Sequence, residues 1–163
     1  MAKQKEEKTN VMRILEQKGI PYTPHAYEHE EGVAVDGVTV AQSLGQDPEC
    51  VFKTLVARGA SQGIYVFCIP VAENLDLKKA ARVVGEKSIE MVHVKEINAL
   101  TGYVRGGCSP VGMKKEYPTV FHETAEIVDT IMVSAGKIGY QVELSPSELI
   151  CLVGAQLADV TVV

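Results

Sequence analysis

The run Val51-Phe-Lys-Thr-Leu-Val-Ala57 is followed, after a short gap, by Ile64-Tyr-Val-Phe-Cys-Ile69. Both runs are rich in β-branched and aromatic residues, which favour strands, and the turn-forming residues 59–63 (Gly-Ala-Ser-Gln-Gly) separate them. This pattern predicts a β-hairpin of two adjacent antiparallel strands. The remaining elements can be placed around this hairpin.

The segments on both sides of the hairpin predict a mixture of helices and strands. Capping residues and stop glycines predict helices over 11–18, 38–44, 77–84, 94–100 and from Ser145 through 150–153. Two prolines make 20–29 extended, and further strands are expected at 88–92, 119–121, 130–134 and 140–144. Because the elements do not alternate strictly, we expect an α+β fold with a mixed β-sheet flanked by helices, and a single domain over residues 1–163.

Composition limits where the protein works. No apolar run approaches the length of about 20 residues needed to cross a bilayer, and Met1 to Asn10 are too polar for a signal peptide or an anchor. The four cysteines, Cys50, Cys68, Cys108 and Cys151, form no C-x-x-C pair and suggest neither a disulfide framework nor a structural zinc site. We therefore expect reduced thiols, a cytoplasmic location and no membrane partner.

The charge balance argues against a general nucleic-acid binder. The chain has 16 basic and 21 acidic residues, a net charge of −5. A protein that holds DNA or RNA through its phosphates usually carries a basic excess. We expect no DNA partner, and any contact with RNA must be a local patch or depend on a second protein.

Lys53 is the most informative residue because it interrupts a strand of core-type residues. Strand alternation places it on the face shared by Val51 and Leu55, where an unpaired ammonium is costly. One interpretation is a lysine that faces a ligand. The other is an edge-strand lysine whose stem lies along the sheet while its charge reaches water.

Two turns could supply backbone donors to an anion. Residues 101–112 contain four glycines, which allow N–H groups to face a phosphate or a developing oxyanion, although the spacing fits neither a dinucleotide fingerprint nor a P-loop. Arg105, Lys114 and Lys115 flank this loop. Residues 134–139 form a similar turn that begins with Ser134. Both could equally be tight surface turns.

The chain carries no obvious nucleophile or metal site. No G-x-S-x-G elbow or other triad signature is present. Cys108 is better explained as a small apolar side chain than as a reactive thiol. His25 and His29 would bind zinc together only on a helix, which the nearby prolines disfavour, so we expect no metal. An enzyme of this kind would depend on a shaped and polarised pocket.

Taken in order, these segments resemble the YbaK family, the free-standing relatives of the editing domain inserted in bacterial prolyl-tRNA synthetases. The matching stretches are 25–29 (HAYEH), 51–55 (VFKTL), 75–79 (LDLKK), 101–103 (TGY), 106–112 (GGCSPVG), 134–137 (SAGK) and the helix start at 145–149. They cover nearly the whole chain.

The resemblance implies a compact α+β domain that hydrolyses misacylated tRNA, typically Cys-tRNA(Pro) and also Cys-tRNA(Cys), without a metal or other cofactor. It implies that Lys53 is the essential lysine at the aminoacyl 3′ end of the tRNA. Tyr27, Thr54, Gly106, Gly107 and Ser134 would line the same pocket. In cysteine-specific members the thiol of the substrate attacks its own ester, which would explain the lack of a protein nucleophile.

The sequence also departs from that family. Some cysteine-specific members carry an acidic residue where Gln141 stands, Arg is common where Ile138 stands, and Asp is frequent in the segment around His122. The removed amino acid could therefore be alanine, serine or threonine. The acidic net charge further suggests action on a synthetase–tRNA complex, with prolyl-tRNA synthetase as the partner. The alternative function is a non-catalytic module that binds a nucleotide or aminoacyl group beside a synthetase.

Overall fold

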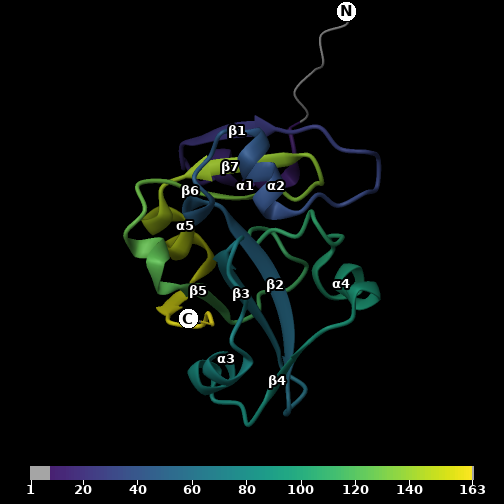
Figure 1. Ribbon diagram of the computed structural model, residues 1–163, viewed down its shortest axis with the longest axis vertical. Helices are drawn as coiled ribbons and strands as arrows, with labels where there is room; N and C mark the ends of the chain where they lie inside the picture. Colours follow the sequence, from purple (N-terminus) through teal and green to yellow (C-terminus); the bar gives the residue numbers. More distant parts are fainter. Residues whose placement is uncertain (1–7, 163) are drawn as a thin grey trace, which may run out of the picture.

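The computed structural model describes residues 8–162 and shows an α+β fold (Figure 1). The predicted polar N-terminus, Met1 to Asn10, lies outside the described residues except for its last three. Within residues 8–162 the strands form two sheets, one of five strands and one of three. No helix in this part of the chain is both long and apolar enough to span a membrane.

The five-stranded sheet is built on the predicted hairpin. Strand β2 (Phe52–Gly59) pairs antiparallel with β3 (Ile64–Pro70), so that Lys53 lies opposite Ile69. The strand order is β4-β2-β3-β5-β8, with β4 (Ile89–Met91) antiparallel to β2, and with β5 (Thr119–His122) and β8 (Gln156–Ala158) parallel to their neighbours. The prediction of a mixed sheet is confirmed. Strand β8 was not predicted, because three residues are too few to show an alternating pattern.

The three-stranded sheet has the order β1-β7-β6 and is antiparallel. Its strands are β1 (Tyr22–Ala26), β6 (Ile131–Ser134) and β7 (Tyr140–Leu144). The sequence predicted these segments as extended but not their separation into a second sheet. Strand pairing between distant segments depends on tertiary packing, which local patterns do not record.

The five α-helices of residues 8–162 begin and end within about one residue of the predicted positions. They are α1 (Asn10–Gln17), α2 (Gly37–Ser43), α3 (Leu77–Val84), α4 (Val94–Thr101) and α5 (Pro146–Val153). The side chains of Thr9, Asp36, Asp76 and Ser145 accept the first free N–H groups of four of them. Two short 3-10 turns, η1 (Pro48–Cys50) and η2 (Glu123–Glu126), complete the chain.

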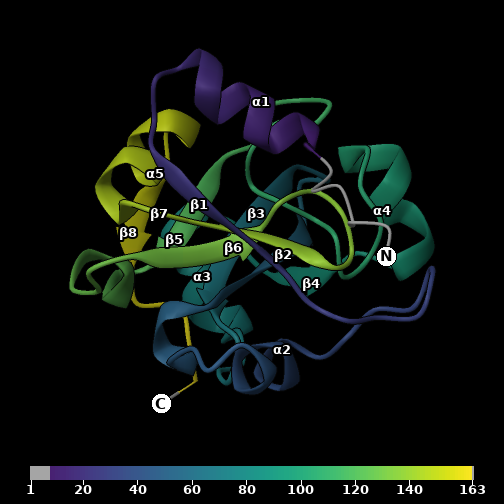
Figure 2. The same ribbon diagram turned by 90° about the horizontal axis from the view of Figure 1, so that it is seen from above.

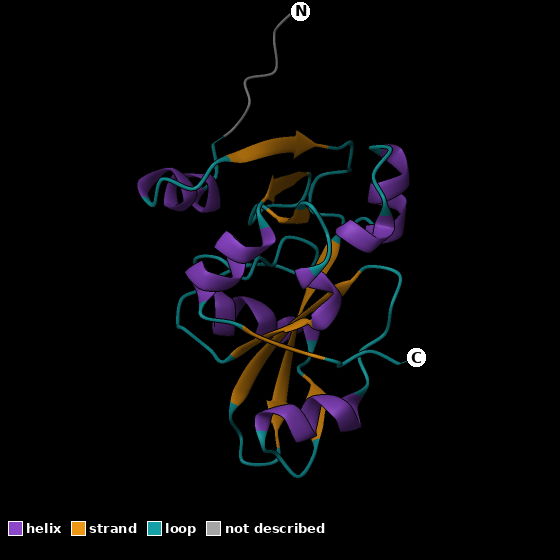
Figure 3. Ribbon diagram, turned by 90° about the vertical axis from the view of Figure 1, so that its left-hand side faces the viewer, coloured by secondary structure: helices purple, strands orange, loops and turns teal. Residues whose placement is uncertain are grey.

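The helices cover opposite faces of the small sheet. Helix α1 packs Val11 and Leu15 against Val142 of β7 in the main core, whereas Ala41 of α2 packs with Met132 of β6 on the other face. Seen from above, α1 and α2 lie on opposite sides of the crossing strands (Figure 2). The side view places the small sheet at one end of the molecule and α3 at the other (Figure 3).

Candidate functional site

The two sheets meet where β2 and β6 run side by side, at a parallel bridge between Val51 and Met132. Lys53 and Ser134 each lie two residues beyond this bridge, in the same direction along their strands. Because strand side chains alternate, both belong to the face that Val51 and Met132 share, which is the face covered by α2. The fold therefore brings Lys53 and Ser134 to the junction of the sheets.

Lys53 is half-buried and projects from a section of β2 that β4 does not cover, because β4 pairs only with residues 57–59. Burial lowers the pKa of the Lys53 ammonium, and the negative charges of Asp36 and Glu73 oppose this shift. No described residue forms a hydrogen bond or ion pair with the Lys53 nitrogen. The lysine is thus a partly desolvated cation that retains its capacity to bind a ligand.

A row of polar side chains continues from Ser134 across the small sheet. Ser134 is directly opposite Gln141 on β7, and Gln141 is directly opposite His25 on β1. Gln141 is only 5% exposed, and its Oε1 accepts a hydrogen bond of 2.9 Å from Nε2 of Gln46. Oε1 of Gln46 is itself buried without a partner in the described residues. Below we call Lys53, Ser134, Gln141 and Gln46 the junction site.

The pair His25–Glu143 borders the junction site. Nε2 of His25 lies 2.8 Å from Oε1 of Glu143, and Thr130 donates a 2.5 Å hydrogen bond to the other carboxylate oxygen. The bonds from Thr130 and His25 lower the pKa of Glu143. This carboxylate is therefore ionised and fixed in position at neutral pH.

The glycine-rich loop contacts the turn that follows Ser134. A Cβ on Gly107 would lie 3.0 Å from the backbone nitrogen of Ile138, which is tighter than most Cβ contacts, so any other residue would force the two loops slightly apart. Gly106 packs against Ala34, two residues before Asp36. However, the N–H of Gly107 donates to the carbonyl of Val104 (2.9 Å) and is not available to an oxyanion.

The other predicted site residues take different positions. The N–H of Tyr27 donates to the carbonyl of Gly139 (2.9 Å), and burial raises the pKa of its phenol. Thr54 faces the opposite side of β2 from Lys53, and its Oγ1 lies 3.6 Å from Sγ of Cys68. The fold therefore brings the loop of Gly106 and Gly107 and the segment of Tyr27 against the turn that follows Ser134. It does not place Thr54 on the face of Lys53.

The buried thiols are poor nucleophiles. Burial raises the pKa of Cys108 to about 11 and that of Cys68 to about 12. Cys108 packs against Val56 and Val92, as expected for a small apolar side chain. A thiolate at either position would be rare at neutral pH.

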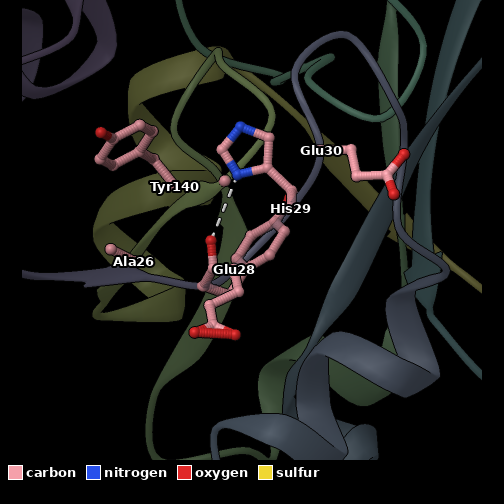
Figure 4. Close-up of a pocket in the computed structure, with 7 residues that line it drawn as sticks. Ala26, Glu28, His29, Glu30 and Tyr140 are labelled. Atoms are coloured by element: carbon pink, nitrogen blue, oxygen red, sulfur yellow. Dashed lines mark hydrogen bonds between the residues drawn. The ribbon is translucent and has the colours of Figure 1, made fainter.

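Sequence reasoning missed three contributors to the site. Gln46 and Asp36 sit in loops with no motif, and only the fold shows that they approach Gln141 and Lys53. The sequence predicts Tyr140 only as part of a strand, yet it lines an open hollow together with His29 and Gly139 (Figure 4). No signal in the sequence distinguishes Tyr140 from a core aromatic residue.

Residues 32–152 match the family model described as the aminoacyl-tRNA editing domain, and the chain therefore belongs to that family. The resemblance inferred from the sequence is confirmed.

Particular relatives agree with this assignment. A protein of Enterococcus faecalis named as a candidate Cys-tRNA(Pro)/Cys-tRNA(Cys) deacylase, EbsC, is 46% identical over 162 residues, which is 99% of this chain and 98% of the relative. The crystal structure of a candidate trans-editing enzyme for prolyl-tRNA synthetase has a TM-score of 0.79 at 28% identity, covering 94% of this chain and 95% of the other. The hypothetical protein APE2540 shares the fold, with a TM-score of 0.83 at 24% identity over 96% of this chain and all of the other.

Proposed function

We propose that this protein is a trans-editing aminoacyl-tRNA deacylase that removes cysteine from tRNA(Pro), and also from tRNA(Cys). The observation that carries the proposal is the half-buried, unpaired Lys53 ammonium at the junction of the sheets, beside Ser134. A protein rarely retains a desolvated cation without a partner unless a ligand supplies the opposite charge. The 3′ end of a tRNA carries such charge on its phosphates.

The chemistry that the family resemblance implies needs no protein nucleophile. The thiolate of the bound cysteine attacks its own ester carbonyl, the tRNA hydroxyl leaves with a proton, and a thiolactone forms. Water then opens the thiolactone to give free cysteine. The high pKa of Cys108, about 11, supports a nucleophile that comes from the substrate.

The role of the protein is to position the ester and to stabilise the charge that develops on its carbonyl oxygen. Each of these effects can contribute several kcal/mol. Lys53 holds the 3′ end in this scheme. The N–H of Gly107 is engaged with Val104, and those of Ala135 and Gly136 are engaged with Tyr140 and Ser134. In this scheme the oxyanion donors therefore come from Gly106 or from the later part of the turn, residues 138–139.

The lining of the junction site bears on which amino acid is removed. Gln141 and Gln46 line it with neutral amides. A pocket for a small side chain separates close analogues by only about 1–3 kcal/mol for each methylene group. We therefore place cysteine first and alanine, serine and threonine after it.

A deacylation panel tests the function. Cys-, Ala-, Ser-, Thr- and Pro-tRNA(Pro), and Cys-tRNA(Cys), are incubated with the protein and ester loss is followed. Fast release of cysteine and retention of proline are expected. If no aminoacyl-tRNA of the panel is cleaved while tRNA still binds, the chain is a binding module, and the hydrolase proposal is wrong.

We further propose that the protein acts in the cytoplasm on a complex of prolyl-tRNA synthetase and tRNA. The net charge of −5 supports this partner, because an acidic protein gains little from general phosphate attraction. Co-sedimentation of the protein with synthetase and tRNA(Pro) should yield a ternary complex. Equal deacylation rates with and without synthetase, together with no co-sedimentation, would contradict it.

A further inference from the structure

Tyr103 lies where the glycine-rich loop, helix α1 and the turn that follows Ser134 meet. A Cβ on Gly136 in that turn would lie 3.0 Å from Cε1 of the Tyr103 ring and 3.0 Å from Cγ2 of Val11 in α1. The ring also packs against the main core and against the buried cluster around Cys108. The turn therefore rests on this ring, so the position of the ring determines how closely the turn can approach.

The hydroxyl of Tyr103 closes the glycine-rich loop. It donates a hydrogen bond of 2.6 Å to the carbonyl of Val111, which is only 2% exposed. Gly106 and Gly107 lie between these two residues, so a single side-chain bond joins the two ends of the segment that contains them. Burial raises the pKa of the Tyr103 phenol to about 12, and the hydroxyl therefore keeps its proton and remains a donor at neutral pH.

Helix α4 fixes the backbone of Tyr103. The N–H of Tyr103 donates to Oγ1 of Thr101 (3.0 Å), and the hydroxyl of Thr101 donates to the carbonyl of Ile97 (2.8 Å). Thr101 is the last residue of α4 and is 1% exposed. The ring and the hydroxyl of Tyr103 thus project from the end of a helix, which allows them to hold two loops in a defined geometry.

From these contacts we propose that Tyr103 is a positioning residue for cleavage of the ester. It acts through the two segments that carry the remaining oxyanion donors: its hydroxyl holds the loop of Gly106, and its ring holds the turn that contains residues 138–139. The hydroxyl is engaged with Val111 and is not offered to the ester itself. A displacement of about 1 Å can cost a factor of about 100 in rate, so a residue that fixes both segments affects catalysis without touching the substrate. This inference rests on the proposed function and deepens it.

The test removes the Tyr103 hydroxyl and compares the effect with that of a matched tyrosine. Tyr117 also donates to a backbone carbonyl, that of Leu100 (2.7 Å), but this bond ends on α4 instead of on the glycine-rich loop. Deacylation of Cys-tRNA(Pro) by the full chain is measured for the parent protein, Tyr103→Phe and Tyr117→Phe. We expect kcat to fall about tenfold in Tyr103→Phe with KM within about twofold of the parent value, because stabilisation specific to the transition state is lost. Tyr117→Phe should keep both constants.

Two further measurements separate positioning from loss of stability. Both phenylalanine variants remove one hydrogen bond of the same kind, so their melting temperatures should fall by a similar amount, about 2–4 °C. Amide hydrogen exchange followed by mass spectrometry should become faster in segments 104–112 and 135–140 of Tyr103→Phe, while α3 exchanges as in the parent protein.

Thr101→Val keeps the test decisive if Tyr103→Phe does not fold. This change retains the hydroxyl of Tyr103 and removes the bond that fixes its backbone, so kcat should fall about threefold with the same unchanged KM.

The outcomes distinguish the role of Tyr103 from the proposed function. An active parent protein with a parent-like kcat in Tyr103→Phe, or in Thr101→Val where the first variant does not fold, overturns the inference. Equal losses of kcat in Tyr103→Phe and Tyr117→Phe, or unchanged exchange in both segments, overturn it too. A parent protein that cleaves no aminoacyl-tRNA contradicts the proposed function and, with it, this role for Tyr103.

Discussion

Two clusters of polar side chains among residues 8–162, each with a buried member, differ in how fully the fold satisfies them. At the edge of the large sheet, His122 uses both ring nitrogens, accepting from the N–H of Val160 (3.2 Å) and lying 3.4 Å from Oγ1 of Thr161. Nearby, Lys79 donates to Asp159 (3.0 Å) and to the carbonyl of Thr161 (2.9 Å). At the junction site, by contrast, Lys53 and Oε1 of Gln46 have no partner within residues 8–162.

The comparison separates a structural cluster from a functional one. Buried polar groups stabilise the fold only when they are hydrogen-bonded. The His122 cluster meets this condition while it attaches the C-terminal segment to the start of α3, so it requires no ligand. Unsatisfied groups cost stability and are retained where a ligand completes them. If this distinction is correct, changes at the two sites should have opposite effects on activity and on stability.

The largest effect is expected for Lys53→Met, which keeps the length of the stem and removes the charge. Deacylation of Cys-tRNA(Pro) should fall by about 100-fold or more, because one positioned electrostatic group contributes about that factor. Single-turnover rates measured with Lys87→Met as the control test this. A rate within threefold of the parent protein would remove Lys53 from the mechanism.

The same variant should gain stability. Because burial lowers the folded-state pKa of Lys53, the unfolded chain binds more protons, and the charged lysine destabilises the fold at pH values below the folded pKa. This penalty disappears as pH rises above the ordinary lysine value of about 10.5. The melting temperature of Lys53→Met should therefore exceed that of the parent protein at pH 7, and the difference should shrink toward pH 10.

The second effect concerns His122→Ala. It leaves the N–H of Val160 unpaired and opens a cavity beside β5, so the free energy of unfolding should fall by about 2 kcal/mol. Urea denaturation measures this change. The deacylation rate of the folded fraction should remain that of the parent protein, and a rate loss above tenfold would show that the His122 cluster is not purely structural.

The third effect concerns the double change Gln46→Met with Gln141→Met. Replacing both hydrogen-bonding partners with apolar groups should change the free energy of unfolding by less than about 1 kcal/mol. If the amides contact the substrate, the deacylation rate should fall about tenfold, or the preference among Cys-, Ala- and Ser-tRNA(Pro) should change. Parent-like rates on all three substrates would make the pair structural.

The smallest effect is the pH dependence contributed by Glu143. Its folded pKa is lowered, first by Thr130 and then by His25, so its contribution to stability is present above the ordinary carboxyl value and is lost as pH falls through the folded value. Because the pair is partly exposed, this contribution should be below about 1 kcal/mol. Melts from pH 3 to 6 should show a steeper acid loss for the parent protein than for Glu143→Gln.

The sequence predicts the local elements well and the assembly less well. Thr9, Asp76 and Ser145 signal helix starts through chemistry confined to a few residues, and the structure has those helices where predicted. The second sheet arises from pairing between β1 and β7, which are far apart in the sequence: the side chains of His25 and Glu143, which contact each other across it, are 118 positions apart. No local pattern encodes this pairing. Lys53 could be recognised because a cation is anomalous in an apolar strand. Gln46 could not, since a glutamine in a loop is ordinary.

The bridge between Val51 and Met132 has a consequence for the folding chain. Lys53 belongs to one sheet and Ser134 to the other, and neither strand alone presents the pair. In a nascent or partly folded molecule, Lys53 would lie apart from Ser134. If Lys53 and Ser134 act together as proposed, such a molecule would leave aminoacyl-tRNA intact, and ester cleavage would require the completed native state.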